Sequence, residues 1–337
     1  MDSPKLTVLD VGHGTSAVLH DSKGLVIFDA GPGATLDEYL QSCKIEKVTA
    51  LLVSHSDADH LAGASNILLA EDVHIEAVYL NPDADQGSVA FETFRRALAN
   101  SIQRTGTVVH TQLTKTTGTS ISAGDVTIAI LAPSPNLATT GPGGTDLKGR
   151  RIRPNTMSAV VHLSIGERPV ALLAGDIDQV ALEHLLEEND RIQAETLVFP
   201  HHGGRPGSAD PKTFTTTLVN AVKPRLILFS TGRGKKNINP IPPVVEAILE
   251  ADPSIHIACT QLSTQCSAST PTPGTHLSTL TAAGKEGRKC CIGTVEISLS
   301  KEKETFPILA EHRAFVTEHV ETALCILPAR ASGHEIN

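Results

Sequence analysis

Three apolar runs in this 337-residue chain each end in a short stretch of histidine and aspartate. Such runs are typical of buried strands, and a loop at a strand's end can turn its side chains onto one centre. Imidazole nitrogen and carboxylate oxygen are suitable ligands for Zn²⁺ or Mn²⁺. The pattern therefore predicts a metal centre at three strand ends, with these segments: Ser54-His-Ser-Asp-Ala-Asp-His60 after 50–53, Asp176 after Ala171-Leu-Leu-Ala-Gly, and His201-His202 after Leu197-Val-Phe-Pro.

Each stretch taken alone also fits a simpler interpretation. The first could be a polar turn with two incidental histidines, Asp176 a turn aspartate, and the last a histidine pair on a surface loop. Three strand ends that present only histidine and aspartate favour the metal centre over these separate explanations.

Strand-like and helix-like stretches alternate through two successive groups, and the strands are frequently neighbours. This order predicts an α/β fold in which two sheets lie between helices. We expect the prolines at 242 and 243 to begin a helix, because a proline in the first turn sacrifices no internal hydrogen bond. The expected strands are 5–11, 15–20, 25–29, 50–53, 126–131, 158–165, 169–174, 197–200 and 225–230, and the expected helices are 36–42, 89–102, 180–186 and 244–249.

Composition excludes several classes of protein. Hydrophobic residues make up 40% of the chain and charged residues 19%, as in ordinary globular proteins. No apolar run approaches the length of a membrane span, and the first residues lack a signal peptide's apolar stretch, so we expect a cytoplasmic protein with no membrane partner. A net charge of −9 argues against a basic coat, though not against a local basic groove. Aromatic content of 3% argues against recognition by broad base stacking.

The order of five motifs resembles the metallo-β-lactamase superfamily. Within it, the chain is most similar to the metallohydrolase domain of ComEC/Rec2-type DNA-uptake proteins and their free-standing relatives; phosphorylcholine esterases show a similar ligand pattern. The resemblance covers about residues 5–250 and implies an αββα sandwich with the metal site at one edge, between the sheets. The motifs are D-V-G-H-G (Asp10–Gly14), F-D-A-G (Phe28–Gly31), H-x-D-x-D-H (His55–His60), L-A-G-D (Leu173–Asp176) and P-H-H-G (Pro200–Gly203).

The resemblance also implies roles for individual residues. His55 and Asp57 would hold one divalent ion; Asp59, His60 and one of His201 or His202 would hold a second; and Asp176 would bridge the two. We favour His202 as the ligand, which leaves His201 to contact a substrate oxygen or act as a general acid. Asp59 would also orient the nucleophile, a water activated between the ions. Asp10 and Asp29 would support the ligand loop or a ligand histidine, although each alone also fits a turn aspartate, and His13 would line the mouth of the site or simply be exposed.

Two departures from the superfamily concern the first ion. Asp57 stands where a second histidine is usual, which makes the site richer in oxygen. The histidine that usually precedes the bridging aspartate is missing; the matching region, Arg153–Ser158, is polar, as in the DNA-uptake relatives. His162 fits a packed or surface histidine better than a replacement ligand. We expect the first ion to be held weakly, or with help from water and substrate.

These observations predict a hydrolase that uses two divalent ions, Zn²⁺ or Mn²⁺, to cleave phosphodiesters, with a DNA or RNA nuclease as the leading interpretation. Two alternatives stay open: a hydrolase of a small phosphodiester such as a cyclic nucleotide or phosphocholine ester, and a catalytically inert metal-binding partner module. A protein partner or a homo-oligomer is also open. The expected substrate-binding residues are Asn155, Ser158, Arg151, Arg153, Arg233 and Lys235, from the basic runs 148–153 and 233–236 and the polar segment between 153 and 158; each basic side chain alone also fits a solvated loop.

The cysteines cluster late in the chain, and clustered thiols in a reducing compartment bind metal more often than they pair. One structural Zn²⁺ site is therefore predicted, with buried thiols that merely pack as an equal alternative. Its expected ligands are Cys259, Cys266, His276 and one of Cys290 or Cys291. The expected organisation is a hydrolase domain over 1–250, a Cys-containing extension over 251–300 packed on it, and a tail over 301–337 that carries no readable pattern.

Overall fold

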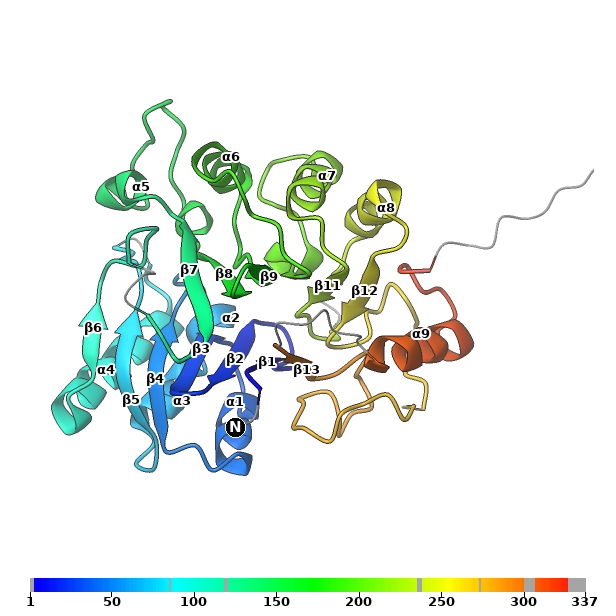
Figure 1. The fold of residues 1–337 in the computed structure, drawn as a ribbon, viewed down its shortest axis with the longest axis horizontal. Coiled ribbons are helices and arrows are strands. Elements are labelled where there is room, and N and C mark those ends of the chain that lie inside the picture. Colours follow the sequence, from blue (N-terminus) through cyan, green and yellow to red (C-terminus); the bar gives the residue numbers. More distant parts are fainter. Residues whose placement is uncertain are drawn as a thin grey trace, which may run out of the picture.

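The computed structural model describes residues 3–84, 86–117, 121–234, 238–272, 274–299 and 307–326, and these form two sheets (Figure 1). In spatial order the seven-stranded sheet is β13 (Val295–Ser298), β1 (Lys5–Val8), β2 (Ser16–Asp21), β3 (Gly24–Ala30), β4 (Lys47–Leu52), β5 (His74–Tyr79) and β6 (Val108–His110). The six-stranded sheet is β12 (His256–Cys259), β11 (Leu226–Phe229), β10 (Thr196–Val198), β9 (Arg168–Leu173), β8 (Val160–Ile165) and β7 (Val126–Ala132).

Both sheets combine antiparallel and parallel pairs in the same way. In the first sheet β1, β2 and β3 pair antiparallel, and β3 to β6 pair parallel. In the second, β7, β8 and β9 pair antiparallel, and β9 to β12 pair parallel. Apart from β13, the strands of the first sheet lie between residues 5 and 110, and those of the second, similar sheet lie between residues 126 and 259. Because parallel strands run in one direction, the ends of β4, β9 and β10 can deliver their loops to a shared edge.

Helices cover the outer face of each sheet, which makes four layers (Figure 1). An apolar core lies between the sheets, with residues such as Phe28, Leu52 and Leu173. Two further cores lie between each sheet and its helices. The αββα fold is therefore confirmed. The helices are α1 (Thr35–Ser42), α2 (Ala58–Leu61), α3 (Ala64–Leu69) and α4 (Val89–Thr105) on the first half, and α5 (Pro135–Thr140), α6 (Gln179–Glu188), α7 (Pro211–Val222), α8 (Pro242–Ala251) and α9 (Pro307–His319) on the second.

Local signals explain the helix ends that the sequence predicted. Ser88 accepts a hydrogen bond from the Phe91 amide and so begins α4, and Gly106, with φ of 74°, ends it. The prolines at 242 and 243 begin α8 as expected. None of the described helices is both long and apolar enough to cross a membrane.

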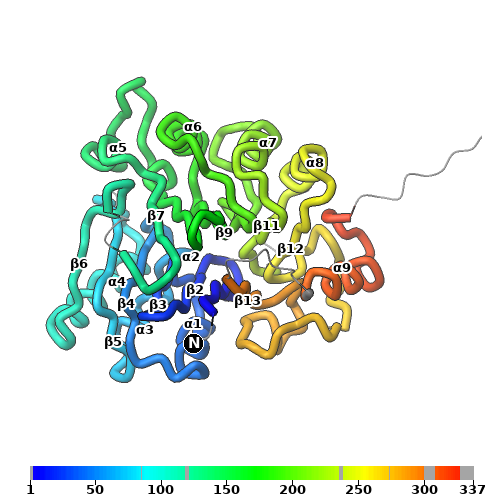
Figure 2. Tube along the Cα trace, in the orientation of Figure 1, coloured from blue at the N-terminus to red at the C-terminus, as the bar shows by residue number. Residues whose placement is uncertain are grey.

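The C-terminal segment is built into both sheets. β12 forms the edge of the second sheet, and β13 returns to pair antiparallel with β1. In Figure 2 the yellow and orange tube runs from β12 past α9 to β13. Part of the tail without a readable pattern is helical: α9 buries Phe315 and Val316 in the core that also contains α7 and α8. The packing of α9 depends on contacts with residues remote in sequence, which explains why no local pattern predicted this helix.

Candidate metal centre

Three strand ends bring four side chains together between the two sheets. Ligand-type atoms of Asp59, His60, Asp176 and His202 all lie within 4.8 Å of one another, and within the described parts of the chain no other group of three or more His, Cys, Asp and Glu does so. Asp59 and His60 follow β4 in the first sheet, Asp176 follows β9, and His202 follows β10 in the short helix η3 (Pro200–Gly203). The edge between the sheets is therefore where the predicted residues meet.

His60 is fully buried and held by a carboxylate on each side. Its Nδ1 lies 2.7 Å from Asp29 Oδ2, and its Nε2 lies 3.4 Å from Asp176 Oδ1. Burial alone would lower the pKa of His60, but the carboxylates of Asp176 and Asp29 outweigh it and raise that pKa well above its ordinary value. Nδ1 donates to Asp29, so Nε2 is the nitrogen directed into the cluster, where a bound cation would take the place of its proton.

His202 is oriented by a backbone carbonyl. Its Nδ1 lies 2.7 Å from the Ser230 oxygen, so Nδ1 carries the proton and Nε2 is free to bind. Nε2 lies 3.1 Å from Asp59 Oδ2 and 3.9 Å from Asp176 Oδ2. Burial would raise the pKa of Asp176, yet His60 and His202 hold it well below its usual value. The Asp176 carboxylate is therefore ionised between two imidazoles.

His55 and Asp57 lie beside this cluster. The ring of His55 lies 4.2 Å from that of His60, centre to centre, and its Nε2 is 3.5 Å from Asp57 Oδ2. His55 is buried, whereas the Asp57 side chain is 43% exposed and accepts a hydrogen bond from Gln86. The predicted first-ion pair thus forms next to the four-residue cluster and opens to solvent through Asp57.

The donor set fits a divalent cation. Nε2 of His55 and Nε2 of His60 are buried and lack a hydrogen-bond partner among the described residues. A buried imidazole nitrogen without a partner costs free energy, and a cation would accept its lone pair. Three carboxylates nearby supply the negative charge that a dication needs: Asp57, Asp59 and Asp176.

Three of the six non-glycine residues with a left-handed backbone among those described lie at or beside the cluster. Asp29, His201 and His202 adopt φ of 57°, 54° and 53°, in the left-handed region that residues other than glycine rarely enter. Each such residue costs on the order of 1 kcal/mol and persists only where its surroundings impose it. At these three positions the strained backbone belongs to a residue that carries or supports the cluster.

A family comparison decides how this cluster is to be interpreted. The model of the metallo-beta-lactamase superfamily matches residues 9–209, which include all three strand ends. The chain belongs to the metallo-β-lactamase superfamily. No curated protein sequence matches it.

The chain is also similar to several solved structures at low sequence identity. The metallo-beta-lactamase fold protein YhfI from Bacillus subtilis is 14% identical, with a TM-score of 0.46, and the match covers 77% of this chain and 97% of YhfI. A diphosphatase from the PhnP family is 14% identical, with a TM-score of 0.39, over 67% of this chain and 85% of that one. Human tRNase Z, short form, is 13% identical, with a TM-score of 0.36, over 66% and 91%.

In this superfamily member the paired histidines have different environments. His202 points into the cluster, in line with the preference for it as a ligand. His201 Nε2 lies 3.0 Å from the Ile177 carbonyl, and its Nδ1 is 3.5 Å from Asp176 Oδ2. The expectation that His201 contacts substrate or acts as a general acid therefore needs correction, because both ring nitrogens face protein groups. Its contacts are those of a positioning residue for Asp176, to which its backbone amide also donates.

The two early aspartates also have different partners. Asp29 holds His60 and the Ser54 amide and hydroxyl, which is the supporting role expected of it. Asp10 touches no ligand histidine; it accepts hydrogen bonds from Gly12, Gln261 and Gly284. Burial raises the pKa of Asp10. The expectation for Asp10 is corrected accordingly: it ties the first loop to the C-terminal segment.

His13 lies at the mouth of the centre. Its Nε2 is 3.7 Å from Asp59 Oδ2, and its ring lies 4.5 Å from that of His202. The side chains of His13 and Asp59 are 27% and 29% exposed, so both reach solvent. Burial, aided by the charge of His202, lowers the pKa of His13. A neutral imidazole therefore lies at the surface beside Asp59.

The predicted substrate-binding residues lie in different parts of the structure. Ser158 lies inside the centre, where its hydroxyl accepts from the Asp176 amide at 2.9 Å and lies 3.4 Å from His55 Nδ1. Asn155 begins the short helix η2 (Asn155–Met157) that leads to Ser158. Arg151 and Arg153 line a cavity at the start of α6.

Arg233 does not face substrate. Its guanidinium donates hydrogen bonds to the carbonyl oxygens of Leu262 and Ser267, so it binds the C-terminal segment of the chain. The expectation for Arg233 is therefore corrected to a structural role. Lys235 lies outside the described residues.

Cys259, Cys266 and Cys291 line one small pocket together with Cys325, but within the described residues no three of the predicted zinc ligands bring their ligand atoms within 4.8 Å of one another. The Cys290 thiol contacts Asp10, the Cys291 thiol lies 3.2 Å from His312 Nε2, and His276 Nε2 is directed at the Cys291 carbonyl. Burial raises the pKa of the thiols of Cys259 and Cys291 well above the ordinary value, so they are protonated. The structure corrects the zinc prediction in favour of its alternative, packed neutral thiols.

Two supporting residues were missed in the sequence. Ser54 stands next to His55 in the motif, and its hydroxyl lies within 3.3 Å of Asp29 Oδ2, His55 Nδ1 and His60 Nδ1. Its place in the motif was an available signal. Ser230 acts through its backbone oxygen, for which the residue type carries no signal.

Proposed function

We propose that this superfamily member is a metal-dependent hydrolase of phosphodiesters. The observation that carries the proposal is the convergence of Asp59, His60, Asp176 and His202 within 4.8 Å, with His55 and Asp57 beside them. These residues would hold two divalent ions, Zn²⁺ or Mn²⁺. When bound, such ions acidify water and polarise a phosphoryl oxygen. The ComEC/Rec2-like subtype stays a proposal that rests on Asp57 and the polar segment ending at Ser158.

The chain's own residues would orient the metal ligands and the attacking water, and would accept protons. Asp29 and the Ser230 carbonyl fix which nitrogen of His60 and His202 faces the centre. Asp59 reaches both the cluster and solvent, so its carboxylate is placed to orient an attacking water. His13, next to Asp59 at the mouth, takes the substrate-facing role that His201 cannot fill. A neutral imidazole there can donate a hydrogen bond to a substrate oxygen.

Phosphate esters suit this centre better than neutral esters or amides. Asp57 replaces a nitrogen ligand with oxygen, which favours hard cations that pair with phosphate. Arg151 and Arg153 line a separate cavity and have no ion-pair partner among the described residues, and guanidinium groups in such a setting bind phosphate. The six free cysteines fit a reducing compartment, and we propose the cytoplasm.

Hydrolysis of bis(p-nitrophenyl) phosphate tests this function. We expect turnover by protein reconstituted with Mn²⁺ or Zn²⁺. His60→Ala and Asp176→Ala should each lower kcat at least about 100-fold, because each removes a group at the reacting centre. His162→Ala, a histidine on the second sheet outside the cluster, should keep full activity. Metal-loaded protein that hydrolyses neither this ester nor any nucleic acid would contradict the proposal and support an inert metal-binding module.

A further inference from the structure

A cavity of about 330 Å³ is lined in part by residues that follow two of the candidate metal ligands in the chain. Its walls come from the loop 141–153, the start of α6 and residues 206–209. The chain connects it to the centre on two sides, since Asp178 is two residues beyond Asp176, and Pro206 is four beyond His202. Because each residue spans at most about 3.6 Å of chain, Asp178 lies within about 7 Å of Asp176 and Pro206 within about 14 Å of His202, measured between Cα atoms.

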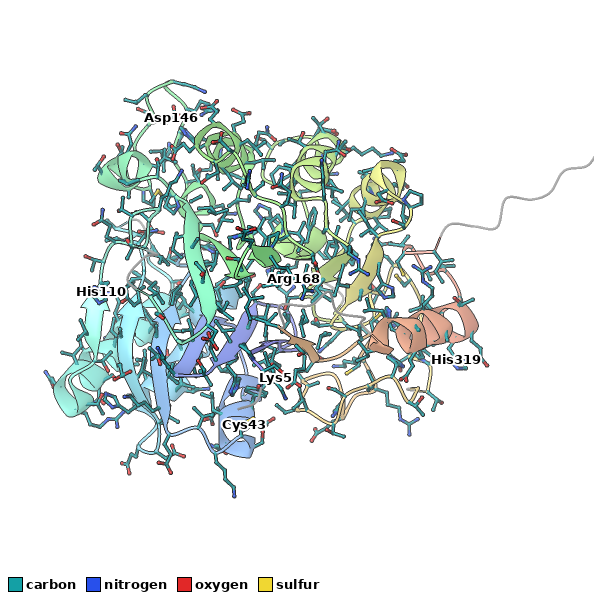
Figure 3. The ribbon with its side chains drawn as sticks, in the orientation of Figure 1. Lys5, Cys43, His110, Asp146, Arg168 and His319 are labelled. Atoms are coloured by element: carbon teal, nitrogen blue, oxygen red, sulfur yellow. The ribbon has the colours of Figure 1, made fainter. Side chains whose placement is uncertain are left out.

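Ion pairs hold the loop 141–153 against α6. Arg150 pairs with Asp146 and with Glu183 on α6, and Lys148 pairs with Glu187 one turn further. Figure 3 shows Asp146 near the outer end of this loop, above α6. Two cations of the basic run thus serve to fix the loop and are not available to a ligand.

The other two cations of the run are available. Arg151 and Arg153 are exposed and line the cavity, and neither has an ion-pair partner among the described residues. They alternate with Ile152, which is fully buried, so an extended backbone places both arginines on the opposite side from it. The loop is therefore built to present two guanidinium groups together.

The acidic side chains of the cavity are already satisfied. Asp178 accepts hydrogen bonds from the Ala181 amide and the Thr156 hydroxyl, and Glu183 is paired with Arg150. Three arginines and these two carboxylates line the cavity, so its net charge is positive. Guanidinium groups in this setting bind phosphate.

The structure assigns the cavity to a second phosphate of a nucleic-acid strand whose neighbouring phosphodiester lies at the metal centre. This inference rests on the proposed function and extends it from phosphodiesters in general to polynucleotides. No aromatic side chain lines the cavity, so it offers no stacking surface for a base. Contact is therefore with the backbone, and cleavage should show little dependence on base sequence.

Binding of a fluorescent phosphorothioate 12-mer of single-stranded DNA, followed by anisotropy across a salt series, tests the inference on full-length, Mn²⁺-loaded protein. Each phosphate contact contributes about 0.7 to the slope of log K against log salt for single strands, so Arg151→Gln/Arg153→Gln should reduce the slope by about 1.4. The matched control is Arg95→Gln/Arg96→Gln, which removes two exposed charges from α4 on the other sheet. It should leave the slope unchanged.

Kinetics separate this inference from the function on which it rests. The Arg151/Arg153 variant should raise KM for a cleavable 12-mer at least about 10-fold, as expected for the loss of two charge-assisted contacts, and leave turnover of bis(p-nitrophenyl) phosphate unchanged. A slope and KM equal to those of the control pair would overturn the inference, as would an equal KM increase for a mononucleotide ester, which would indicate a small substrate. Arginine-dependent binding without any hydrolysis would overturn the proposed function alone.

Discussion

Asp29 Oδ2 lies 2.7 Å from His60 Nδ1, and this contact determines which nitrogen of the buried imidazole faces the cluster. Asp29 is the second-last residue of β3, and His60 lies in α2 after the neighbouring strand β4. The left-handed backbone of Asp29 and the hydrogen bonds from Ser54 hold the carboxylate in place. Ligand orientation at this centre is therefore set by a residue that does not itself reach the cation position.

Replacing that carboxylate should weaken metal binding. Asp29→Asn keeps the shape of the side chain but removes its charge, so we expect a 10- to 100-fold loss in affinity for Zn²⁺ or Mn²⁺, roughly the effect of losing such a support. Competition with a chromogenic chelator measures it. Asp125→Asn, an exposed aspartate, is the control. Equal affinities in the two variants would show that Asp29 does not orient His60.

The cysteines should not hold a metal. The thiols of Cys259 and Cys291 are buried and protonated, and the predicted zinc ligands do not converge. Cys266→Ala and Cys291→Ala should therefore leave the metal content per chain unchanged, as measured by inductively coupled plasma mass spectrometry. If either folded variant holds one zinc per chain less than the wild-type protein, the cysteines do bind a structural zinc and this prediction is wrong.

Helix α9 should stabilise the second half of the fold. Phe315 is 4% exposed, and its ring lies 4.3 Å from that of His276. Phe315→Ala should lower the free energy of unfolding by about 3 kcal/mol, as is usual for a buried phenylalanine. Urea denaturation measures the change, and Leu147→Ala, at 88% exposed, should change it by less than about 0.5 kcal/mol. Similar small effects in both would mean that α9 is not docked.

Stability should fall as the pH drops below 6.5, because two buried histidines resist protonation. Burial lowers the pKa of His312 to about 3 and that of His256 to about 4, and His312 Nδ1 lies 3.0 Å from His256 Nε2. The unfolded chain takes up protons near pH 6.5, whereas the folded chain does not, so stability is complete above pH 6.5 and is lost between there and pH 4.

A variant isolates this effect from other titrating groups. Between pH 7 and pH 5, His312→Gln should lose about 2 kcal/mol less unfolding free energy than the wild-type chain, the value for one histidine that titrates only when unfolded. Urea denaturation at both pH values gives the difference. The same loss in both proteins would contradict the assignment of this pH dependence to His312.

Local sequence signals predicted what depends on local structure. The apolar runs before His55, Asp176 and His201 marked strands whose ends meet, and the two prolines marked the start of α8. Partners remote in sequence were not predictable. Asp10 is held by Gln261 and Gly284, and no pattern near Asp10 indicates those contacts.

The basic residues illustrate the same limit. Arg150 and Arg151 are adjacent and chemically equal, yet the first is paired with Glu183, more than thirty residues away, and the second is not. Arg233 is spent on carbonyl groups of the C-terminal segment. Which cations are available to a ligand follows from tertiary contacts and not from residue type.

The central claim is that Asp59, His60, Asp176 and His202 bind a divalent cation. Anomalous diffraction from crystals of the Mn²⁺-loaded protein tests it most directly. We predict a manganese peak within bonding distance of Nε2 of His60 and His202 and of the carboxylates of Asp59 and Asp176. Well-ordered crystals with these four side chains in place and no anomalous peak between them would contradict the account.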